Sequence, residues 1–378
     1  MSAPSRWLGL DALRGLSIGA MILVNNPGRW RSDHIYAPLR HADWHGCTFT
    51  DLVFPTFLFC CGVAIVPAMQ RRLQQGLPRG PMLASLLRRV VTLVLLGMFL
   101  SAFPLLSFAE GESLLQPVLD VRFPGVLQRI GVCYGVAAAL FLFTSERAQR
   151  LVLWSCLLLY WPLLVLGSQS LDDPAQTLAG AIDQAVFGEH IYKVGRYDPE
   201  GLLSTIPALA TCLFGVEAGR VLRSERDVGD KVSTLLRRGC LLLLLGAVWG
   251  WFFPINKALW TSSYAVWTGG VAMVGLGLCV WWFEQRAHRR VGTWLQIYGV
   301  NALLVFVGSG VLARIVGRMW KVTTDTGDVV SAKEWFFQNA LLSWLPPRAA
   351  SLAFALLWVA VWFTVLSRLF RRGIVWKV

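Results

Sequence analysis

The sequence predicts an all-α, polytopic integral membrane protein, a bundle of about ten transmembrane helices. Of its 378 residues, 55% are hydrophobic and only 15% are charged, whereas soluble domains carry roughly 25% charged residues. The chain also contains 18 tryptophans against 7 tyrosines, and tryptophan is enriched where helices cross the membrane–water interface. No linker or shift in composition divides the chain, so we expect a single domain over residues 1–378.

Ten stretches are apolar and long enough to cross a bilayer, for which a helix needs about 20 residues. They are Trp7–Val24, Asp51–Met69, Leu83–Phe108, Val126–Thr144, Leu151–Gly167, Leu202–Leu222, Gly239–Pro254, Leu259–Phe283, Trp294–Val316 and Ala350–Leu369. No signal-peptide cleavage motif follows the first stretch, so we expect it to remain as a helix. A shorter amphipathic segment, Ala332–Leu345, either lies on the membrane surface or forms an eleventh, partial span.

The loops between these stretches alternate in charge. The basic loops contain Arg71, Arg72, Arg79, Arg147, Arg150, Arg220, Arg223, Arg226, Lys231, Arg286, Arg289, Arg290, Arg368, Arg371 and Arg372. The mixed or acidic loops contain Glu110, Glu112, Asp172, Asp173, Asp183, Asp325 and Asp328. Because loops rich in Lys and Arg remain in the cytoplasm, we expect both termini to be cytoplasmic, which requires an even number of spans and favours ten.

The net charge of +13 does not indicate nucleic-acid binding, because the basic residues lie in short runs between apolar spans. The 8 cysteines form no CxxC pair or disulfide spacing. Seven of them fall in apolar stretches, where we expect them to pack: Cys60, Cys61, Cys133, Cys156, Cys212, Cys240 and Cys279.

The segment HADWHGCTFTDLVFP is the most informative part of the chain. It places His41, Asp43, His45 and Asp51 where a polar loop runs into an apolar span. Ionisable groups at membrane depth cost several kcal/mol each, and histidine titrates near neutral pH, so this segment indicates proton chemistry. The H-x-x-x-H spacing also occurs in zinc sites, but no glutamate follows the first histidine and no third ligand is evident, so we expect no metal.

Four apolar spans begin with polar motifs on the predicted outer side. These motifs are the segment above, RFPGVLQR (Arg122–Arg129), YDPEGLLST (Tyr197–Thr205) and NKALWTSSY (Asn256–Tyr264). We expect a shared outer cavity that collects His41, Asp51, Arg122, Gln128, Arg129, Glu200, Asn256 and Lys257.

Three of these motifs also have a structural explanation. Asp198 and Pro199 suit the cap and first position of a helix, Lys257 and Arg122 can extend to lipid headgroups, and Trp260 and Tyr264 suit an aromatic belt. Arg129 is harder to explain in this way, because it lies about one turn inside an apolar stretch.

Three further polar positions lie within or at the ends of spans. Asp11 and Arg14 share one helical face near the cytoplasmic end of the first span, as an ion pair or as a polar entrance. Asn25, with Asn26, ends that span and either caps it or faces the outer cavity. Asn301 lies within the ninth span, as an interhelical hydrogen bonder or as a cavity group.

The motifs taken together resemble the transmembrane acetyltransferases, a family that includes lysosomal heparan-α-glucosaminide N-acetyltransferase and bacterial NagX-type proteins linked to N-acetylglucosamine use. The matching stretches are MILVNNPG, HADWHGCTFTDLVFPTFLF, RFPGVLQRIGV, YDPEGLLSTIPA, GVEAGRVL, PINKALWTSSY and YGVNALLVFVG, in that order. They extend from Leu10 to about Gly310, nearly all of the chain.

The resemblance implies an enzyme that takes the acetyl group of cytosolic acetyl-CoA, a co-substrate, and passes it to the amine of glucosamine or of a glucosamine-terminated saccharide in the periplasm. His41 matches the histidine that is proposed to be catalytic in this family, and Asp51 is expected to be its partner. Asn25 matches the family's asparagine at the end of the first span. We expect His41 to act as general base or to carry the acetyl group covalently, and Asn25, Asn256 or Lys257 to stabilise the oxyanion.

We expect further residues to bind the acceptor or acetyl-CoA. They are His45, Arg122, Gln128, Arg129, Asp198, Glu200, Asn256, Lys257, Trp260, Tyr264, Asn301 and, near the coenzyme A phosphates, Arg14. The resemblance also suggests a bacterial inner-membrane location and a homodimer. Two other functions fit the residues: an amino-sugar transporter, because polar cavities between spans serve transporters too, and an O-acyltransferase that modifies envelope glycans.

Overall fold

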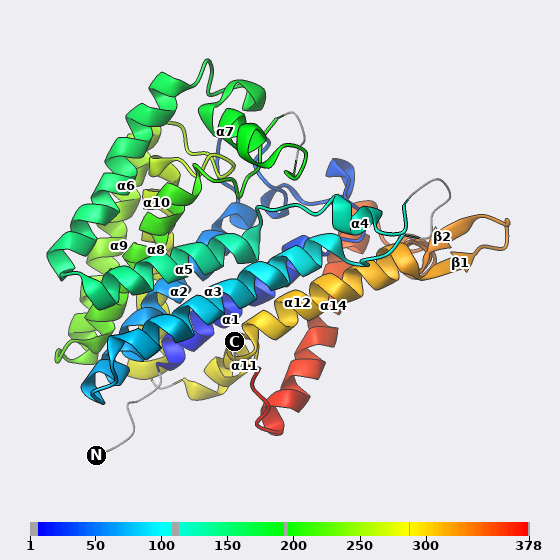
Figure 1. Ribbon diagram of the computed structural model, residues 1–378. Coiled ribbons are helices and arrows are strands. Elements are labelled where there is room, and N and C mark those ends of the chain that lie inside the picture. The colour runs from blue at the N-terminus through cyan, green and yellow to red at the C-terminus, as the bar shows by residue number, and fades with distance from the viewer. Residues whose placement is uncertain (1–6, 108–112, 193–195, 287, 377–378) are drawn as a thin grey trace.

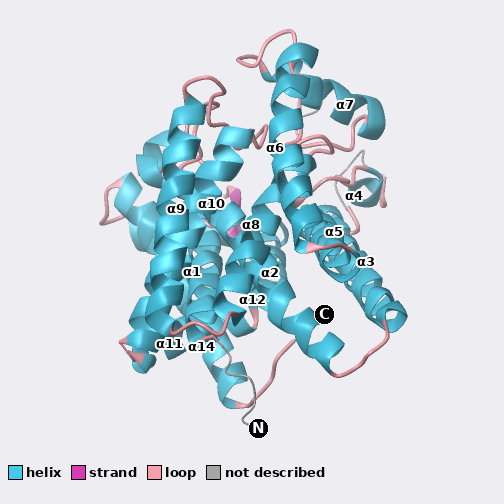
Figure 2. Cartoon of the chain, turned by 90° about the vertical axis from the view of Figure 1, so that its left-hand side faces the viewer, coloured by secondary structure: helices cyan, strands magenta, loops and turns pink. Residues whose placement is uncertain are grey.

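Helices form most of the structure, which is a computed structural model and describes residues 7–107, 113–192, 196–286 and 288–376 (Figures 1 and 2). Within these ranges ten helices are long and apolar enough to cross a membrane, which confirms the predicted bundle of about ten spans and an integral membrane protein. They are α1 (Leu8–Asn25), α2 (Phe49–Gln74), α3 (Arg79–Ala102), α5 (Val126–Phe143), α6 (Glu146–Gly167), α8 (Thr205–Arg223), α9 (Val228–Gly250), α10 (Ser262–Val280) with a π-helical turn at Trp281–Gln285, α12 (Ala302–Arg314) with a π-helical turn at Ile315–Met319, and α14 (Pro347–Arg371).

Shorter elements lie between these spans. They are 3₁₀ turns at Ser32–His34, Ala37–Leu39 and Pro174–Gln176, the helices α4 (Gln116–Leu119), α7 (Leu178–Phe187), α11 (Arg289–Val300) and α13 (Ala332–Phe336), a π-helical turn at Phe337–Leu342, and the strands β1 (Lys321–Thr323) and β2 (Val329–Ser331). The two strands pair antiparallel, with Lys321 opposite Ser331, and this hairpin projects from the bundle (Figure 1).

Polar residues in the loops define where several spans begin. Ser145, Asp227 and Thr261 precede α6, α9 and α10, and the side chain of each accepts a hydrogen bond from the backbone N–H three residues later. Such caps satisfy N–H groups that have no partner inside the helix. They therefore fix where the loop ends and the apolar span starts.

The ninth predicted span, Trp294–Val316, is wrong in its extent. The helix breaks at Asn301, whose backbone leaves the helical region at φ −114° and ψ 37°, and this break separates α11 from α12. The amide of Asn301 donates to the carbonyl of Ile374 and accepts from the N–H of Trp376, so the chain after α14 fills the break. An apolar pattern alone does not reveal this interruption, because the residues on both sides remain apolar.

The amphipathic segment Ala332–Leu345 is not a further full span. It consists of the five residues of α13, a π-helical turn and an irregular end before α14. An ion pair between Arg29 and Glu334 joins it to the loop after α1. The described residues thus favour ten spans, and the cytoplasmic location of both termini remains a prediction. Phe108 at the end of the third predicted span, together with Glu110 and Glu112, lies outside the described residues.

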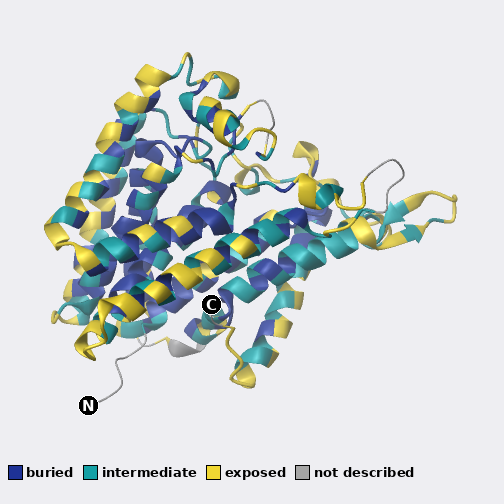
Figure 3. Ribbon diagram, in the orientation of Figure 1, coloured by how far each residue is buried: buried dark blue, intermediate teal, exposed yellow. Residues whose placement is uncertain are grey.

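The centre of the bundle is formed by α2 and α8, which pack closely along their lengths. Of the α8 span 72% is buried, compared with 22% for α3 and for α6 at the periphery (Figure 3). Glycines allow the close approach: a Cβ atom at Gly62 would overlap the carbonyl oxygen of Cys212, and one at Gly215 would overlap that of Phe59. Because α2 and α8 each follow a polar motif, this contact also sets the distance between those motifs.

We expect Gly215→Leu to destabilise the folded protein strongly, because α2 and α8 must separate to accept the side chain, and overpacking alone costs roughly 1–3 kcal/mol. The measurement is the melting temperature of the purified protein, followed by its tryptophan fluorescence. Gly19→Leu in α1 is the matched control, since a Cβ atom there meets nothing within 4 Å. Equal melting temperatures for the two variants would contradict this account of the α2–α8 contact.

Candidate active site

The site begins at the first turn of α2, where Asp51 is held by the loop before it. Asp51 is the third residue of the helix, and its Oδ2 accepts hydrogen bonds from the backbone N–H groups of Thr48 and Ala42, both at 3.0 Å. The Thr48 hydroxyl donates to the carbonyl of Arg40 at 2.6 Å, which fastens the same loop. The carboxylate is therefore fixed in position, with its other oxygen available.

That second oxygen binds His41. Its Oδ1 lies 2.7 Å from His41 Nδ1, while the side chain of Asp51 is 1% exposed and that of His41 is 48% exposed. An ionised carboxylate only accepts hydrogen bonds, so Nδ1 carries a proton, and in the neutral imidazole Nε2 keeps its lone pair. The arrangement gives a half-exposed histidine whose orientation and neutral tautomer are set by the buried carboxylate.

Lys257 comes to the same place from the loop between α9 and α10. Its Nζ lies 3.0 Å from Nδ1 and 3.4 Å from Nε2 of His41, and 3.7 Å from Oδ1 of Asp51. Burial lowers the pKa of the Lys257 amine below its usual value, and the negative charges of Asp51 and Glu200 oppose that shift. The site thus combines an acid, an imidazole and an amine within hydrogen-bonding range.

His45 forms a second pair nearby, at the outer edge of the site. Its Nε2 lies 2.9 Å from Oδ1 of Asp172, and its Nδ1 lies 3.3 Å from the side-chain nitrogen of Asn256. Asn256 also accepts from the N–H of Leu259, so both ends of its amide are engaged in holding loops together. The backbone N–H of Gly46 donates to the carbonyl of Ile255 at 2.7 Å, which joins the two motifs directly.

Trp260 and Tyr264 support this site from within the bundle and do not form an interfacial belt. Both are 0% exposed, and the Tyr264 hydroxyl donates to the carbonyl of Asp51 at 2.5 Å. Trp260 packs edge-on against Tyr264 and donates from its indole N–H to Thr211. Its backbone has φ +49°, a strained conformation for a bulky residue that persists only where the surroundings fix it.

Arg122 joins the second motif to the third. Its guanidinium forms a two-bond pair with the buried carboxylate of Asp198 and also binds Glu200. Burial disfavours its charge, but the hydrogen bonds and charges of Asp198 and Glu200 outweigh burial and raise the pKa of Arg122. Arg122 therefore fixes the loop before α8 instead of extending to lipid headgroups, and Asp198 is an ion-pair partner, not a helix cap.

Arg129 lies deeper, in the first turns of α5. It is 2% exposed, and its Nη2 donates to the carbonyl of Gly201 at 3.0 Å and to the hydroxyl of Ser204. Its guanidinium also lies 5.0 Å from the centre of the Trp260 ring, a cation–π distance. Among the described residues Nε and Nη1 have no hydrogen-bond partner. Trp260 and Tyr264 lie between Arg129 and Asp51, so we expect Arg129 to position the site without touching His41.

The contacts bring the four predicted motifs together. Four other predicted site residues do not contact His41. Asn25 is exposed at the end of α1 and makes no hydrogen bond to His41 or Asp51. Asn301 binds the chain after α14 through both ends of its amide, and its role in a substrate cavity remains a prediction. Arg14 pairs with Asp11, as the ion-pair alternative requires. Gln128 is buried against Gly97 and Gly125, close to the start of α5.

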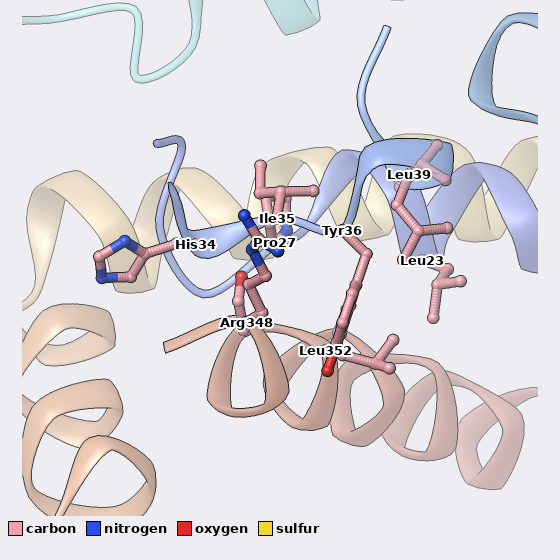
Figure 4. Close-up of a pocket in the computed structure, with 11 residues that line it drawn as sticks. Leu23, Pro27, His34, Ile35, Tyr36, Leu39, Arg348 and Leu352 are labelled. Carbon is pink, nitrogen blue, oxygen red and sulfur yellow. The ribbon is translucent and has the colours of Figure 1, made fainter. Parts of the chain in front are cut away.

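A pocket at the C-terminal end of α1 is separate from the four motifs (Figure 4). The loop after α1 and the start of α14 form its walls, with His34, Tyr36 and Arg348 among the polar groups. Val24 and Pro27, which flank Asn25 in the sequence, also line it. The catalytic assignment of Asn25 therefore remains a prediction.

Asp183 in α7 is a functional candidate that the sequence reasoning missed. It is 1% exposed and accepts from the N–H of Leu202 at 2.8 Å, so it braces the loop that holds Arg122 and Arg129. Burial raises the pKa of its carboxyl to about 6. In the sequence it is one of several acidic residues between two predicted spans. The only sign of its role is that it lies in a short apolar stretch.

The raised pKa of Asp183 predicts a pH effect on stability. Between its ordinary value of 3.8 and about 6 the folded protein binds a proton that the unfolded chain releases, so stability falls as pH rises through this range. We expect Asp183→Asn to flatten this slope in melting temperatures measured from pH 4 to pH 7. Parallel curves for the variant and the wild type would argue against a role for Asp183 ionisation.

Comparison with known proteins identifies the family of this chain. Residues 6–247, well over half of the chain, match the family model described as "Heparan-alpha-glucosaminide N-acetyltransferase, catalytic". Heparan-alpha-glucosaminide N-acetyltransferase of Mus musculus is 28% identical over 435 aligned positions, which cover 100% of this chain and 61% of that protein. For the Homo sapiens protein the identity is 28% over 433 positions, with 99% and 60% covered. The chain thus spans about three fifths of the length of these relatives, and it belongs to the family of heparan-alpha-glucosaminide N-acetyltransferase catalytic domains.

Proposed function

We propose that this protein is a membrane-embedded N-acetyltransferase that moves an acetyl group from cytosolic acetyl-CoA to an amine on the other side of the membrane. The acceptor is glucosamine or a saccharide that ends in glucosamine, and the enzyme is one domain in the inner membrane of a bacterium. The observation that carries the proposal is the His41–Asp51 pair, in which a buried carboxylate holds Nδ1 of a half-exposed imidazole and leaves Nε2 as the basic nitrogen of its neutral form. Family membership supports the reaction class and acetyl-CoA as the donor.

The chemistry requires a base because a protonated amine is not a nucleophile. His41 Nε2 takes a proton from the acceptor nitrogen as this nitrogen attacks the thioester carbonyl. The C–S bond then breaks, and His41 passes the proton to the departing coenzyme A thiolate. Asp51 holds the imidazole in the required tautomer and stabilises the imidazolium that forms, a role that a buried aspartate is suited to. General-base catalysis of this kind contributes roughly 10²–10⁴-fold.

Lys257 is the best candidate to stabilise the oxyanion of the tetrahedral intermediate. Its amine lies within 3.4 Å of both ring nitrogens of His41, and as an ammonium it can donate a hydrogen bond to an oxyanion that forms beside His41. Asn256 is less suited, because both ends of its amide already have partners. A covalent route also fits the geometry: Nε2 attacks the thioester first, and the acetyl group passes from His41 to the acceptor.

The remaining motif residues surround this centre. Glu200 is 8% exposed in its side chain, and its charge acts on Lys257, so we propose that it helps to bind the amino sugar. Arg122, Asp198, Arg129, Trp260 and Tyr264 then hold the loops that form the acceptor site. Binding of the coenzyme A phosphates by Arg14 remains a prediction, and so does the formation of a homodimer.

We expect His41→Ala to reduce acetyl transfer by at least roughly 10²-fold while the affinity for acetyl-CoA stays close to that of the wild type. The measurements are single-turnover transfer to glucosamine and equilibrium binding of acetyl-CoA to the purified protein. His288→Ala, which alters an exposed histidine whose ring nitrogen faces the carbonyl of Arg286, is the control and should retain transfer. Near-normal turnover in His41→Ala would refute the assignment of the base.

A sided assay separates this function from its rivals. Proteoliposomes loaded with radiolabelled acetyl-CoA receive glucosamine outside, and we expect labelled N-acetylglucosamine to appear in the external medium. Uptake of the sugar without any need for acetyl-CoA would point to a transporter instead. Label found only on hydroxyl groups of an added glycan would point to an O-acyltransferase.

A further inference from the structure

We propose that Lys257 is itself an acetyl acceptor, a self-acetylation site whose modification inactivates the catalytic centre. This inference rests on the proposed acetyltransferase function, and it concerns the chemistry that the same base performs when no amino sugar is bound. The side chain of Lys257 carries a primary amine, the same functional group as the proposed acceptor. It is the contacts of this amine with His41 that make it a candidate.

The amine is close enough to the base to be deprotonated by it. Lys257 Nζ lies 3.4 Å from His41 Nε2, and the Lys257 side chain is 18% exposed. The loop that carries it is held at both ends: the N–H of Asn256 donates to Thr261 Oγ1, and the N–H of Thr261 donates to the carbonyl of Asn256. An acyl group brought to His41 therefore also meets the Lys257 amine.

The charge state of Lys257 decides between its two roles. As an ammonium it stabilises an oxyanion, whereas as a free amine it attacks the same carbonyl. Burial lowers the pKa of this amine, which makes the free form more accessible, and the negative charges of Asp51 and Glu200 restrain that shift. An ammonium held next to a base is thus one proton transfer away from being a nucleophile.

The step balances without any further reactant. The Lys257 ammonium first loses one proton to solvent through His41. As the free amine attacks the thioester carbonyl of acetyl-CoA, His41 Nε2 takes a second proton from the nitrogen, an amide bond forms and the C–S bond breaks. The proton held by His41 goes to the departing coenzyme A thiolate. The products are Nε-acetyl-Lys257 and coenzyme A.

The modification has a direct consequence for the site. An acetyl-lysine has no positive charge, so Asp51 and Glu200 lose a counter-charge, and the added acetyl group occupies space next to His41. Because amides are stable to hydrolysis, the modified protein accumulates. We therefore expect acceptor sugar to protect the enzyme, and acetyl-CoA without acceptor to inactivate it progressively.

The test uses the full-length purified protein incubated with acetyl-CoA alone, followed by peptide mass spectrometry and by residual transfer to glucosamine. Lys333 in α13 is the internal control, since it is also half-buried, its pKa is also lowered by burial, and its amine packs over the ring of Phe354. We expect Lys257 to be acetylated roughly 100-fold faster than Lys333, the lower range of general-base catalysis. In the His41→Ala variant we expect Lys257 and Lys333 to be acetylated at similar rates.

Lys257→Arg provides the second readout, because arginine keeps a positive charge and cannot be acetylated in this way. Whatever transfer activity this variant retains should not decline during preincubation with acetyl-CoA, whereas wild-type activity should decline in step with acetyl-Lys257. Transfer to glucosamine by a wild-type enzyme whose Lys257 stays unmodified would overturn the inference and leave the proposed function standing. Absence of both products would overturn both.

Discussion

The fixed carboxylate of Asp51 is the constraint on which the site depends. It is 1% exposed, and it receives two backbone N–H groups on one oxygen and His41 Nδ1 on the other. A buried charge of this kind is tolerable only when it is fully hydrogen-bonded, so the loop from Arg40 to Thr48 must fold back on the helix start to satisfy it. The same hydrogen bonds that stabilise the charge thereby orient the imidazole, which is the preorganisation that catalysis requires.

The helix bundle supports this arrangement by bringing distant polar motifs together. The starts of α2 and α10 meet through Tyr264 and Lys257, and the starts of α5 and α8 meet through Arg129 and Ser204. Glycine contacts between α2 and α8 connect the two pairs. Asp51, Arg122 and Lys257 each have a partner that offsets part of their burial cost. Among the described residues Nε and Nη1 of Arg129 have no hydrogen-bond partner, so this compensation is incomplete. Strain at Trp260 lies in the same layer, consistent with a site whose geometry is imposed by its surroundings.

The apolar pattern predicted the bundle well, because ten long runs of apolar residues leave few alternatives for a chain in a bilayer. It failed at Asn301, where a break in the helix is satisfied by residues more than 70 positions away. The pairing of His41 with Asp51 was predictable from the family resemblance and from their proximity in the sequence. The contacts of His45 with Asp172 and Asn256 could not be predicted, because these residues lie far apart in the sequence and meet only in the folded bundle. Asp183 was missed for the same reason.

The central claim is that Asp51 makes His41 a base by fixing its tautomer, and Asp51→Asn tests it most directly. An amide in this position keeps the size of the side chain but removes the negative charge and the requirement that Nδ1 carry the proton. The measurement is single-turnover acetyl transfer to glucosamine, together with acetyl-CoA affinity and melting temperature. The account predicts a loss of transfer of up to roughly 10⁴-fold, as for the aspartate of a serine-protease triad, with acetyl-CoA affinity retained. Transfer at close to the wild-type rate by a folded Asp51→Asn protein would contradict it.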